Sequence, residues 1–358
     1  MKRILGAIVS LAAAAALAGC GAVPTAPYEE AGAADGGGSG EKLKVYTTLY
    51  SLEYVTKRLG SEHIEVVNMV PAGVEAHDFE PTARDMVALT KADLFIYNGS
   101  GLELWVEKAV ANLDTHHTLI LNATEGLDLQ TEKKADSPIG AQTAARNGEN
   151  SADGHAADHA VDHADALPGE GAANVHDGHG HSHGDVDPHV WLDPTLLKKQ
   201  AEAIKDALAA KDSAHAAAYE ENFQKLAADL DQLDREFQEM VGQAAKKEFM
   251  VSHSAFSYLA NRYGLEQIAI SGIDPSDEPS PAEMKELVER VKEHAISYVL
   301  LEPMVSSDVA EVIAREAGVK TATLNPLEGL TEEDVQTGKD YLAIMRENLE
   351  ALRLALNE

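Results

Sequence analysis

The residues best suited to binding a metal ion lie between His176 and Pro194, in the run H-D-G-H-G-H-S-H-G-D-V-D-P-H-V-W-L-D-P. The first half of this run is crowded with imidazoles and carboxylates, whereas the second half places His189 between Pro188 and an apolar Val-Trp-Leu step. Neutral imidazole is a good ligand for divalent cations such as Zn²⁺. The first half can therefore gather metal ions, and the second half can fix one in place.

Two other histidines follow apolar segments that are typical of β-strands. His77 lies in the loop Pro71–Pro81 after E-V-V-N-M-V, and His253 ends the segment E-F-M-V-S-H. A lone histidine is more often a surface or hydrogen-bonded structural residue than a ligand. In open parallel sheets, however, ligands bind beyond the carboxyl ends of strands. One histidine in that equivalent position in each half of the chain predicts that His77 and His253 join His189 at one site.

Short apolar segments alternate with helical ones, so the sequence predicts an α/β fold built from parallel βαβ units. The predicted strands lie within residues 43–49, 65–70, 93–99, 118–123, 248–253, 266–271, 297–302 and 320–324. The predicted helices cover residues 51–59, 82–91, 102–113, 194–210, 212–243, 254–263, 281–294 and 309–317, and a last helix closes the chain.

The predicted helix at 212–243 is long enough to connect two lobes. Its apolar residues recur every three or four positions and form one stripe, which indicates packing against a core. We therefore expect an N-terminal lobe at 42–211, a stiff connecting helix at 212–244 and a C-terminal lobe at 245–358. The stripe consists of Tyr219, Phe223, Leu226, Leu230, Leu233, Phe237 and Val241.

The N-terminus predicts export and lipid attachment. Lys2 and Arg3 precede an apolar run that ends near Ala18, which is typical of a secretory signal peptide over residues 1–19. Leu-Ala-Gly-Cys at residues 17–20 resembles a bacterial lipobox, which would make Cys20 the lipidated residue; alternatively, Cys20 is an incidental residue of an ordinary signal peptide. Residues 20–41 are predicted to be a flexible tether. The expected location is outside the cytoplasm, anchored to the cell membrane.

Residues 128–185 lack periodicity and are rich in Gly, Ala, Asp and His, so we expect a disordered insertion in the N-terminal lobe. Histidine-rich tracts are typical of metal binding. The alternative is a solvated acidic linker, which would not need so many imidazoles. We predict an auxiliary loop that collects Zn²⁺ and raises its concentration near the main site, through His155, His159, His163, His176, His179, His181 and His183.

The composition excludes one class of partner and favours another. The 358 residues are enough for two domains, and the formal net charge is −31. No basic patch with interleaved aromatic residues is present in the sequence, so nucleic acid is not an expected partner. A strongly negative field attracts cations instead.

Several linked motifs resemble the zinc-specific solute-binding lipoproteins of ABC transporters, of the ZnuA and AdcA type. They include G-V-E-A-H-D-F-E-P, the His-rich insertion running into D-P-H-V-W-L-D-P, V-S-H-S-A-F-S-Y-L-A, G-I-D-P-S-D-E-P-S-P, L-E-P-M-V-S-S and T-L-N-P-L-E-G-L. The resemblance covers nearly all of residues 43–358. Manganese-binding relatives instead have a short, histidine-poor loop and an aspartate in a Phe-Thr-Asp-Ser segment, and this sequence has neither.

The resemblance implies two (β/α) lobes joined by a rigid helix, with one Zn²⁺ in the cleft between them and delivery to an ABC permease. It implies the ligands His77, His189, His253 and Glu328. Glu302, Glu278 and water compete with Glu328 for the fourth position. Asp78, Asp187 and Asp193 lie near the ligands in sequence and are candidates to accept hydrogen bonds from the far imidazole nitrogens, or are simply solvated acids.

Two other functions remain open at this stage. A zinc hydrolase also uses three histidines, but it keeps an open metal position for water, and the motif H-E-x-x-H is absent from the sequence. A surface adhesin or zinc store could share the fold, because a fold does not determine function. We expect a monomeric transport component that is not an enzyme.

Overall fold

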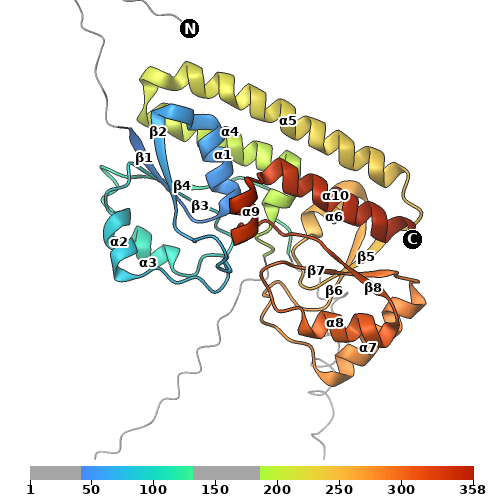
Figure 1. The fold of residues 1–358 in the computed structure, drawn as a ribbon. Helices are drawn as coiled ribbons and strands as arrows, with labels where there is room; N and C mark the ends of the chain where they lie inside the picture. Colours follow the sequence, from blue (N-terminus) through green and yellow to red (C-terminus); the bar gives the residue numbers. More distant parts are fainter. Residues whose placement is uncertain (1–41, 132–185) are drawn as a thin grey trace, which may run out of the picture. The chain divides into compact units, whose positions relative to one another are not determined.

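The computed structural model describes residues 42–131 and 186–358. The N lobe contains the parallel sheet β2-β1-β3-β4, formed by β1 (Leu43–Thr47), β2 (Ile64–Asn68), β3 (Leu94–Tyr97) and β4 (Leu119–Asn122) (Figure 1). Its helices are α1 (Tyr50–Gly60), α2 (Ala83–Leu89), α3 (Val106–Val110) and α4 (Pro194–Lys211), with the 3₁₀ turns η1 (Ser61–His63) and η2 (Val190–Leu192).

The C lobe repeats this arrangement. Its parallel sheet has the order β6-β5-β7-β8, formed by β5 (Glu248–Val251), β6 (Glu266–Ala269), β7 (Tyr298–Leu301) and β8 (Lys320–Thr323). Its helices are α6 (Ser257–Tyr263), α7 (Pro281–Glu293), α8 (Asp308–Ala317), α9 (Glu332–Thr337) and α10 (Tyr341–Asn357). The prediction of an α/β fold with two parallel-sheet lobes is confirmed.

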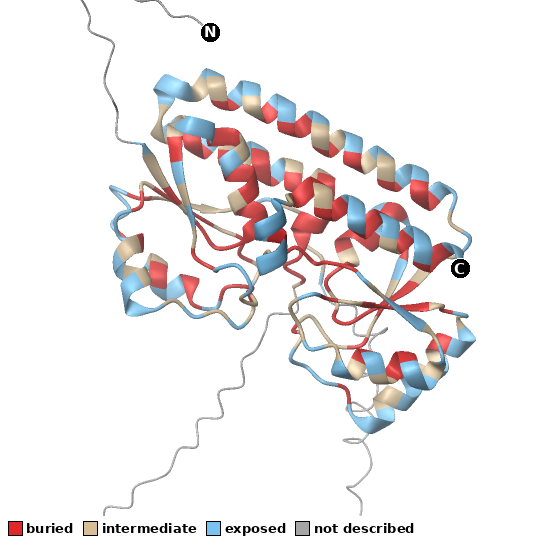
Figure 2. Ribbon diagram, viewed as in Figure 1, coloured by how far each residue is buried: buried red, intermediate tan, exposed pale blue. Residues whose placement is uncertain are grey.

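Helix α5 (Ala216–Gly242) links the lobes, preceded by the 3₁₀ turn η3 (Ser213–His215). Its 27 residues correspond to about 40 Å at 1.5 Å per residue. It packs against α1 and α4 of the N lobe and against α6 and α10 of the C lobe (Figure 1). Figure 2 shows that the side of α5 facing these helices is buried while the outer side is exposed. The buried residues include every member of the predicted apolar stripe.

The central strands β3, β5 and β7 are largely buried, as expected for parallel sheets covered by helices, whereas the edge strands β2 and β8 are partly exposed. In β3, Leu94 and Ile96 belong to one apolar cluster and Phe95 to another. The first cluster is continuous through both sheets, α5 and α10, so the lobes share a core. Within residues 42–131 and 186–358, no helix combines the length and apolar character needed to cross a bilayer.

Two helix predictions were wrong in extent. The helix predicted at 102–113 is reduced to α3, because bends and turns occupy residues at both ends of the predicted range, before Val106 and after Val110. Helix α6 begins at Ser257 instead of residue 254, and α9 was not predicted at all.

Candidate metal centre

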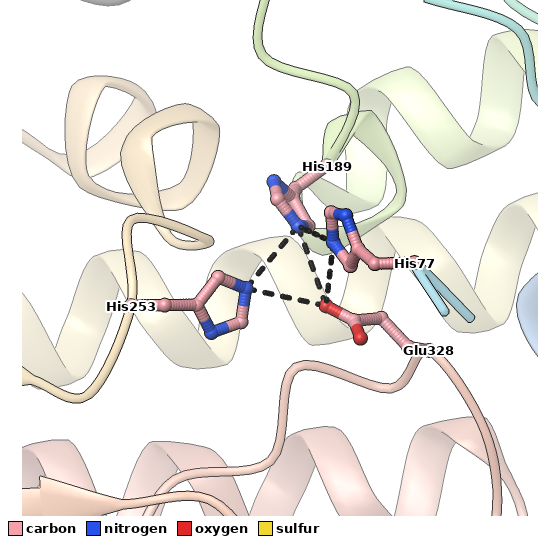
Figure 3. A group of neighbouring side chains, drawn as sticks. All are labelled: His77, His189, His253 and Glu328. Atoms are coloured by element: carbon pink, nitrogen blue, oxygen red, sulfur yellow. Dashed lines mark hydrogen bonds and ion pairs between the residues drawn. The ribbon is translucent and has the colours of Figure 1, made fainter. Parts of the chain in front are cut away.

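Three histidines and one glutamate from four separate segments converge on one point (Figure 3). The Nε2 atom of His189 lies 3.4 Å from Nε2 of His77 and 3.4 Å from Nε2 of His253. Glu328 Oε1 lies 3.3 Å from Nε2 of His189 and of His253, and 3.7 Å from Nε2 of His77. These are the four residues that the sequence predicted as ligands.

Four of these five separations match the edges of a tetrahedron around one zinc ion, and the fifth, between His77 Nε2 and Glu328 Oε1, is slightly longer at 3.7 Å. Zn–N distances of about 2.0–2.1 Å place tetrahedral ligand atoms about 3.3–3.4 Å apart. Glu328 Oε1 is buried and accepts no hydrogen bond from the described residues, and a cation at the centre would satisfy it. Three imidazoles and one carboxylate suit Zn²⁺, whereas Mn²⁺ favours more oxygen ligands and higher coordination.

His253 is fixed by a carboxylate from the neighbouring strand. It follows β5 by two residues, and Glu302 follows β7 directly. Glu302 accepts a hydrogen bond from the His253 backbone N–H at 3.0 Å and another from Nδ1 at 2.7 Å. Burial alone would lower the pKa of His253, but Glu302 and Glu328 raise it well above its ordinary value. The bond from Nδ1 leaves Nε2 facing the cluster, as a metal ligand requires.

His189 is held in the same way by Asp187. Asp187 Oδ1 accepts hydrogen bonds from the His189 backbone N–H at 3.0 Å and from Nδ1 at 2.8 Å. Burial opposes a charged ring, but Asp187 and Glu328 raise the pKa of His189. The adjacent carbonyl of Pro188 accepts a hydrogen bond from the Asn98 side chain, which ties this segment to the end of β3. The prediction that Asp187 supports an imidazole is confirmed.

Glu328 lies on a tightly held loop after β8. Leu327 has a positive φ of 58°, which is unfavourable for a bulky residue and requires support from its surroundings. The Asn325 side chain accepts a hydrogen bond from the Leu327 backbone N–H, and Asn348 bonds both backbone groups of Asn325. The Trp191 indole donates to a carbonyl of the same loop at 2.7 Å. Although burial would raise the pKa of Glu328, the three histidines lower it well below its ordinary value.

His77 lies on the loop between β2 and α2, and Glu75 beside it was missed at the sequence level. Gly73 donates a backbone hydrogen bond to Leu330 at 2.8 Å, which joins this loop to the Glu328 loop. Glu75 Oε1 accepts from the His77 backbone N–H at 3.1 Å. Burial and the neighbouring Glu328 raise the pKa of Glu75 to about 9. The position of Glu75, an acid two residues before the candidate ligand His77, was the signal that could have identified its role from the sequence.

The other candidate acids have different roles. Glu302 supports His253 and does not occupy the fourth position. Asp193 caps α4 by accepting from the Thr195 backbone N–H at 2.7 Å, so it is neither the candidate support of an imidazole nor a simple solvated acid. Among the described residues, no bond joins Asp78 to the three imidazoles. Glu278 and Asp78 line a cavity of about 250 Å³ that also reaches Glu75 and His253.

His77 and His253 both lie beyond the carboxyl end of a strand, as expected, but the two strands are not equivalent in the two sheets. The sheet orders make β1 equivalent to β5 and β2 equivalent to β6. His253 follows β5, whereas His77 follows the edge strand β2.

Cys20, the signal peptide, the tether and the seven histidines of the predicted collecting loop lie outside the described residues.

Comparison with known sequences gives one family and several close relatives. The family described as "Zinc-uptake complex component A periplasmic" matches residues 45–355. "High-affinity zinc uptake system protein ZnuA" of Bacillus subtilis is 36% identical over 355 residues, which cover 99% of this chain and 98% of that protein. "Zinc-binding lipoprotein AdcA" of Streptococcus pneumoniae is 36% identical over 312 residues, which cover 87% of this chain but only 55% of that protein.

Solved structures share the fold. The Zn(II)-bound ZnuA-like domain of Streptococcus pneumoniae AdcA is 33% identical, with a TM-score of 0.68 over 89% of this chain and 100% of that one. The laminin-binding protein of Streptococcus agalactiae, described as bifunctional with adhesin and metal-transporting activity, is 29% identical, with a TM-score of 0.69 over 88% and 100%.

Proposed function

Because this chain belongs to the family of zinc-uptake complex component A proteins, we propose that it captures Zn²⁺ outside the cytoplasm and delivers it to an ABC permease for high-affinity uptake. The observation that carries this proposal is the set of Nε2 and Oε1 atoms at tetrahedral spacing, supplied by both lobes. His77 and His189 come from the N lobe, and His253 and Glu328 from the C lobe. A cation bound by all four therefore ties the lobes together.

The same geometry argues for binding and against catalysis. Zinc enzymes that hydrolyse substrates keep one of four positions open for a water molecule. Here four protein ligands would fill a tetrahedral zinc ion, which leaves no position for a nucleophile. We therefore assign the site to reversible capture of zinc, and the protein is not an enzyme.

The location and the auxiliary loop complete the proposal. Lipid attachment at Cys20 would keep the protein at the outer face of the membrane as a monomer beside the permease. The histidines at 155–183 would bind Zn²⁺ weakly and raise its local concentration. Deletion of residues 153–184 should preserve one tightly bound zinc ion and reduce uptake when zinc is scarce. Loss of the tight site in that variant would show that the loop belongs to the primary site.

The decisive test is a zinc titration of the full chain followed by native mass spectrometry. The wild type should retain one strongly bound zinc ion, and His253→Ala should lose it. His294→Ala is a matched control, because His294 also donates Nδ1 to a carboxylate, Glu248, at 2.7 Å but lies outside the cluster. Retention of the tight zinc by His253→Ala would refute the proposed site.

Growth separates transport from adhesion, the activity also named for the Streptococcus agalactiae structure. A strain that lacks this protein should grow poorly when zinc is limiting and recover when zinc is added. An adhesin or a passive zinc store would not be required for growth under those conditions.

A further inference from the structure

The hydroxyl of Tyr258 joins the C lobe to the segment that supports His189. Tyr258 lies on α6 and is 1% exposed. Its hydroxyl accepts a hydrogen bond from the Gln130 backbone N–H at 2.9 Å and donates one to the Asp187 backbone carbonyl at 2.9 Å. One phenol therefore binds two chain segments that are far apart in sequence. We call this arrangement the α6 clasp, made by Tyr258, Gln130 and Asp187.

The two segments in the clasp are also bonded to each other. The Asp187 backbone N–H donates to the Gln130 carbonyl at 3.0 Å, and an antiparallel bridge pairs Thr131 with Val186. The Asn261 side chain, also on α6, donates to the Gln130 side chain. Helix α6 thus holds the paired ends that flank residues 132–185 and fixes where the chain returns toward His189.

The clasp connects ligands of both lobes. Asp187 orients His189 through its carboxylate and is held by Tyr258 through its carbonyl. Helix α6 begins four residues after His253. His189 and His253 are therefore connected through Asp187, Tyr258 and the start of α6, independently of a bound cation.

We propose that Tyr258 is a positioning residue that keeps the imidazole rings of His189 and His253 in fixed positions relative to each other and slows the release of the bound cation. The inference rests on the proposed function, since it concerns the same zinc site. Without the hydroxyl, the Asp187 segment keeps its bonds to Gln130 and His189 but loses its direct bond to α6, and only the side-chain bond from Asn261 to Gln130 still links the paired segments to this helix. The His189 ring can then move relative to His253, and the coordination opens more often.

A second tyrosine of the same helix provides a matched control. Tyr263 is also buried, and its hydroxyl donates to Asp234 of α5 at 3.1 Å while its ring stacks on Phe237. Tyr263→Phe removes a hydroxyl from α6 just as Tyr258→Phe does, but it breaks a bond that leads to α5 and away from the metal ligands. Both variants keep the aromatic ring and its packing.

The test measures zinc release from the full chain. Zinc-loaded wild type, Tyr258→Phe and Tyr263→Phe are mixed with excess chelator, and release is followed by stopped flow. The release of zinc bound outside the cluster is measured with His253→Ala and subtracted from the signal of the other proteins. Loss of one or two ordinary hydrogen bonds corresponds to about a three- to tenfold change in rate. Tyr258→Phe should release zinc that much faster with one tight zinc retained, and Tyr263→Phe should match the wild type.

Two further measurements separate positioning from general stability. Thermal unfolding of the zinc-free variants should show similar losses for the two phenylalanine substitutions. The NMR signal of the His189 Nδ1 proton should shift in Tyr258→Phe only. Equal release rates for Tyr258→Phe and wild type would overturn the proposal, and so would an equal acceleration by Tyr263→Phe. If the wild type holds no zinc that depends on His253, the proposed function fails and the positioning role fails with it.

Discussion

The two lobes repeat one sheet order but use the loop after the first strand differently. In the N lobe, Thr48 follows β1 and its hydroxyl donates to the buried Glu103. In the C lobe, His253 follows β5 at nearly the same place and donates to the buried Glu302. Each lobe therefore places a buried glutamate beside this loop, but only the C lobe uses it to orient a metal ligand.

The remaining bonds of the two glutamates explain the difference. Glu103 also accepts from the backbone N–H groups of Asn98 and Gly99 at 2.7 and 3.0 Å, so it fastens the turn after β3. Within the described part of the chain, the hydrogen bonds that Glu302 accepts come from the backbone and the ring of His253. The N lobe instead supplies its ligands from the loop after β2 and from the segment before η2. The repeated fold thus supports an asymmetric site.

Removal of the side chains that follow β5 and β1, His253 and Thr48, should affect two different properties of the protein. His253→Ala deletes a ligand, and we expect the zinc affinity to fall at least about 100-fold, with a modest effect on the zinc-free fold. Thr48→Ala should leave zinc affinity unchanged and cost about 1–3 kcal/mol, because Glu103 loses one of its partners in a buried site. Competition with a chelator and thermal unfolding measure the two effects. A large loss of affinity in Thr48→Ala would remove the distinction between the lobes.

Substitution of Glu302 should lower the zinc affinity by less than removal of His253 does, and substitution of Glu103 should leave the zinc affinity unchanged. Glu302→Gln keeps the shape but loses the charge that orients and polarises His253, so we expect about a 10- to 100-fold loss of zinc affinity. Glu103→Gln should bind zinc like the wild type. Isothermal titration in the presence of a competing chelator resolves both values. Equal affinities for all three proteins would show that Glu302 only fills space.

The sequence patterns were sufficient for the sheets and for the three converging histidines. Alternating apolar segments identified the eight strands, because buried parallel strands are apolar on both faces. His77, His189 and His253 stood out because imidazoles followed strands or a proline turn. Glu328 came only from the resemblance to a known family, since its loop has no spacing that marks a ligand.

Except for the bond between His189 and the nearby Asp187, the supporting bonds could not be predicted, because they join residues that are distant in the chain. Glu302 was considered only as a ligand, since nothing local shows that it lies against the His253 ring. Asp193 was considered as a support for an imidazole or as a solvated acid, but the Asp-Pro-Thr start of α4 uses it as a helix cap. The clasp of Tyr258 on Gln130 and Asp187 depends on packing between lobes, which periodicity does not encode.

The pH dependence of stability should reveal Glu103. Burial raises the pKa of this carboxyl above its ordinary value of 4.5, although Thr48 and backbone N–H groups oppose the shift. A raised folded-state pKa contributes stability that is present below the ordinary value and is lost as the pH rises through the folded value. Relative to Glu103→Gln, the wild type should therefore lose stability from about pH 4.5 upward. Thermal unfolding of both proteins from pH 4 to 8 checks the sign, and a constant difference would contradict it.

The smallest contrast concerns helix caps in the two lobes. Thr82 with Asp85 and Ser280 with Glu283 form capping boxes at the starts of α2 and α7. Replacing either cap by alanine should cost about 1 kcal/mol. Helix α2 has seven residues and buries only Leu89, whereas the 13 residues of α7 bury two apolar side chains.

Because α2 has little packing to replace its cap, Thr82→Ala should increase amide hydrogen exchange throughout α2 by about fivefold. Ser280→Ala should increase exchange only in the first turn of α7, since packing of the later turns is unaffected. Hydrogen-exchange mass spectrometry with peptides from both helices resolves the two patterns. If exchange rose along the whole of α7, the cap would contribute more than the buried face, and the outer helices of the two lobes would be stabilised in the same way.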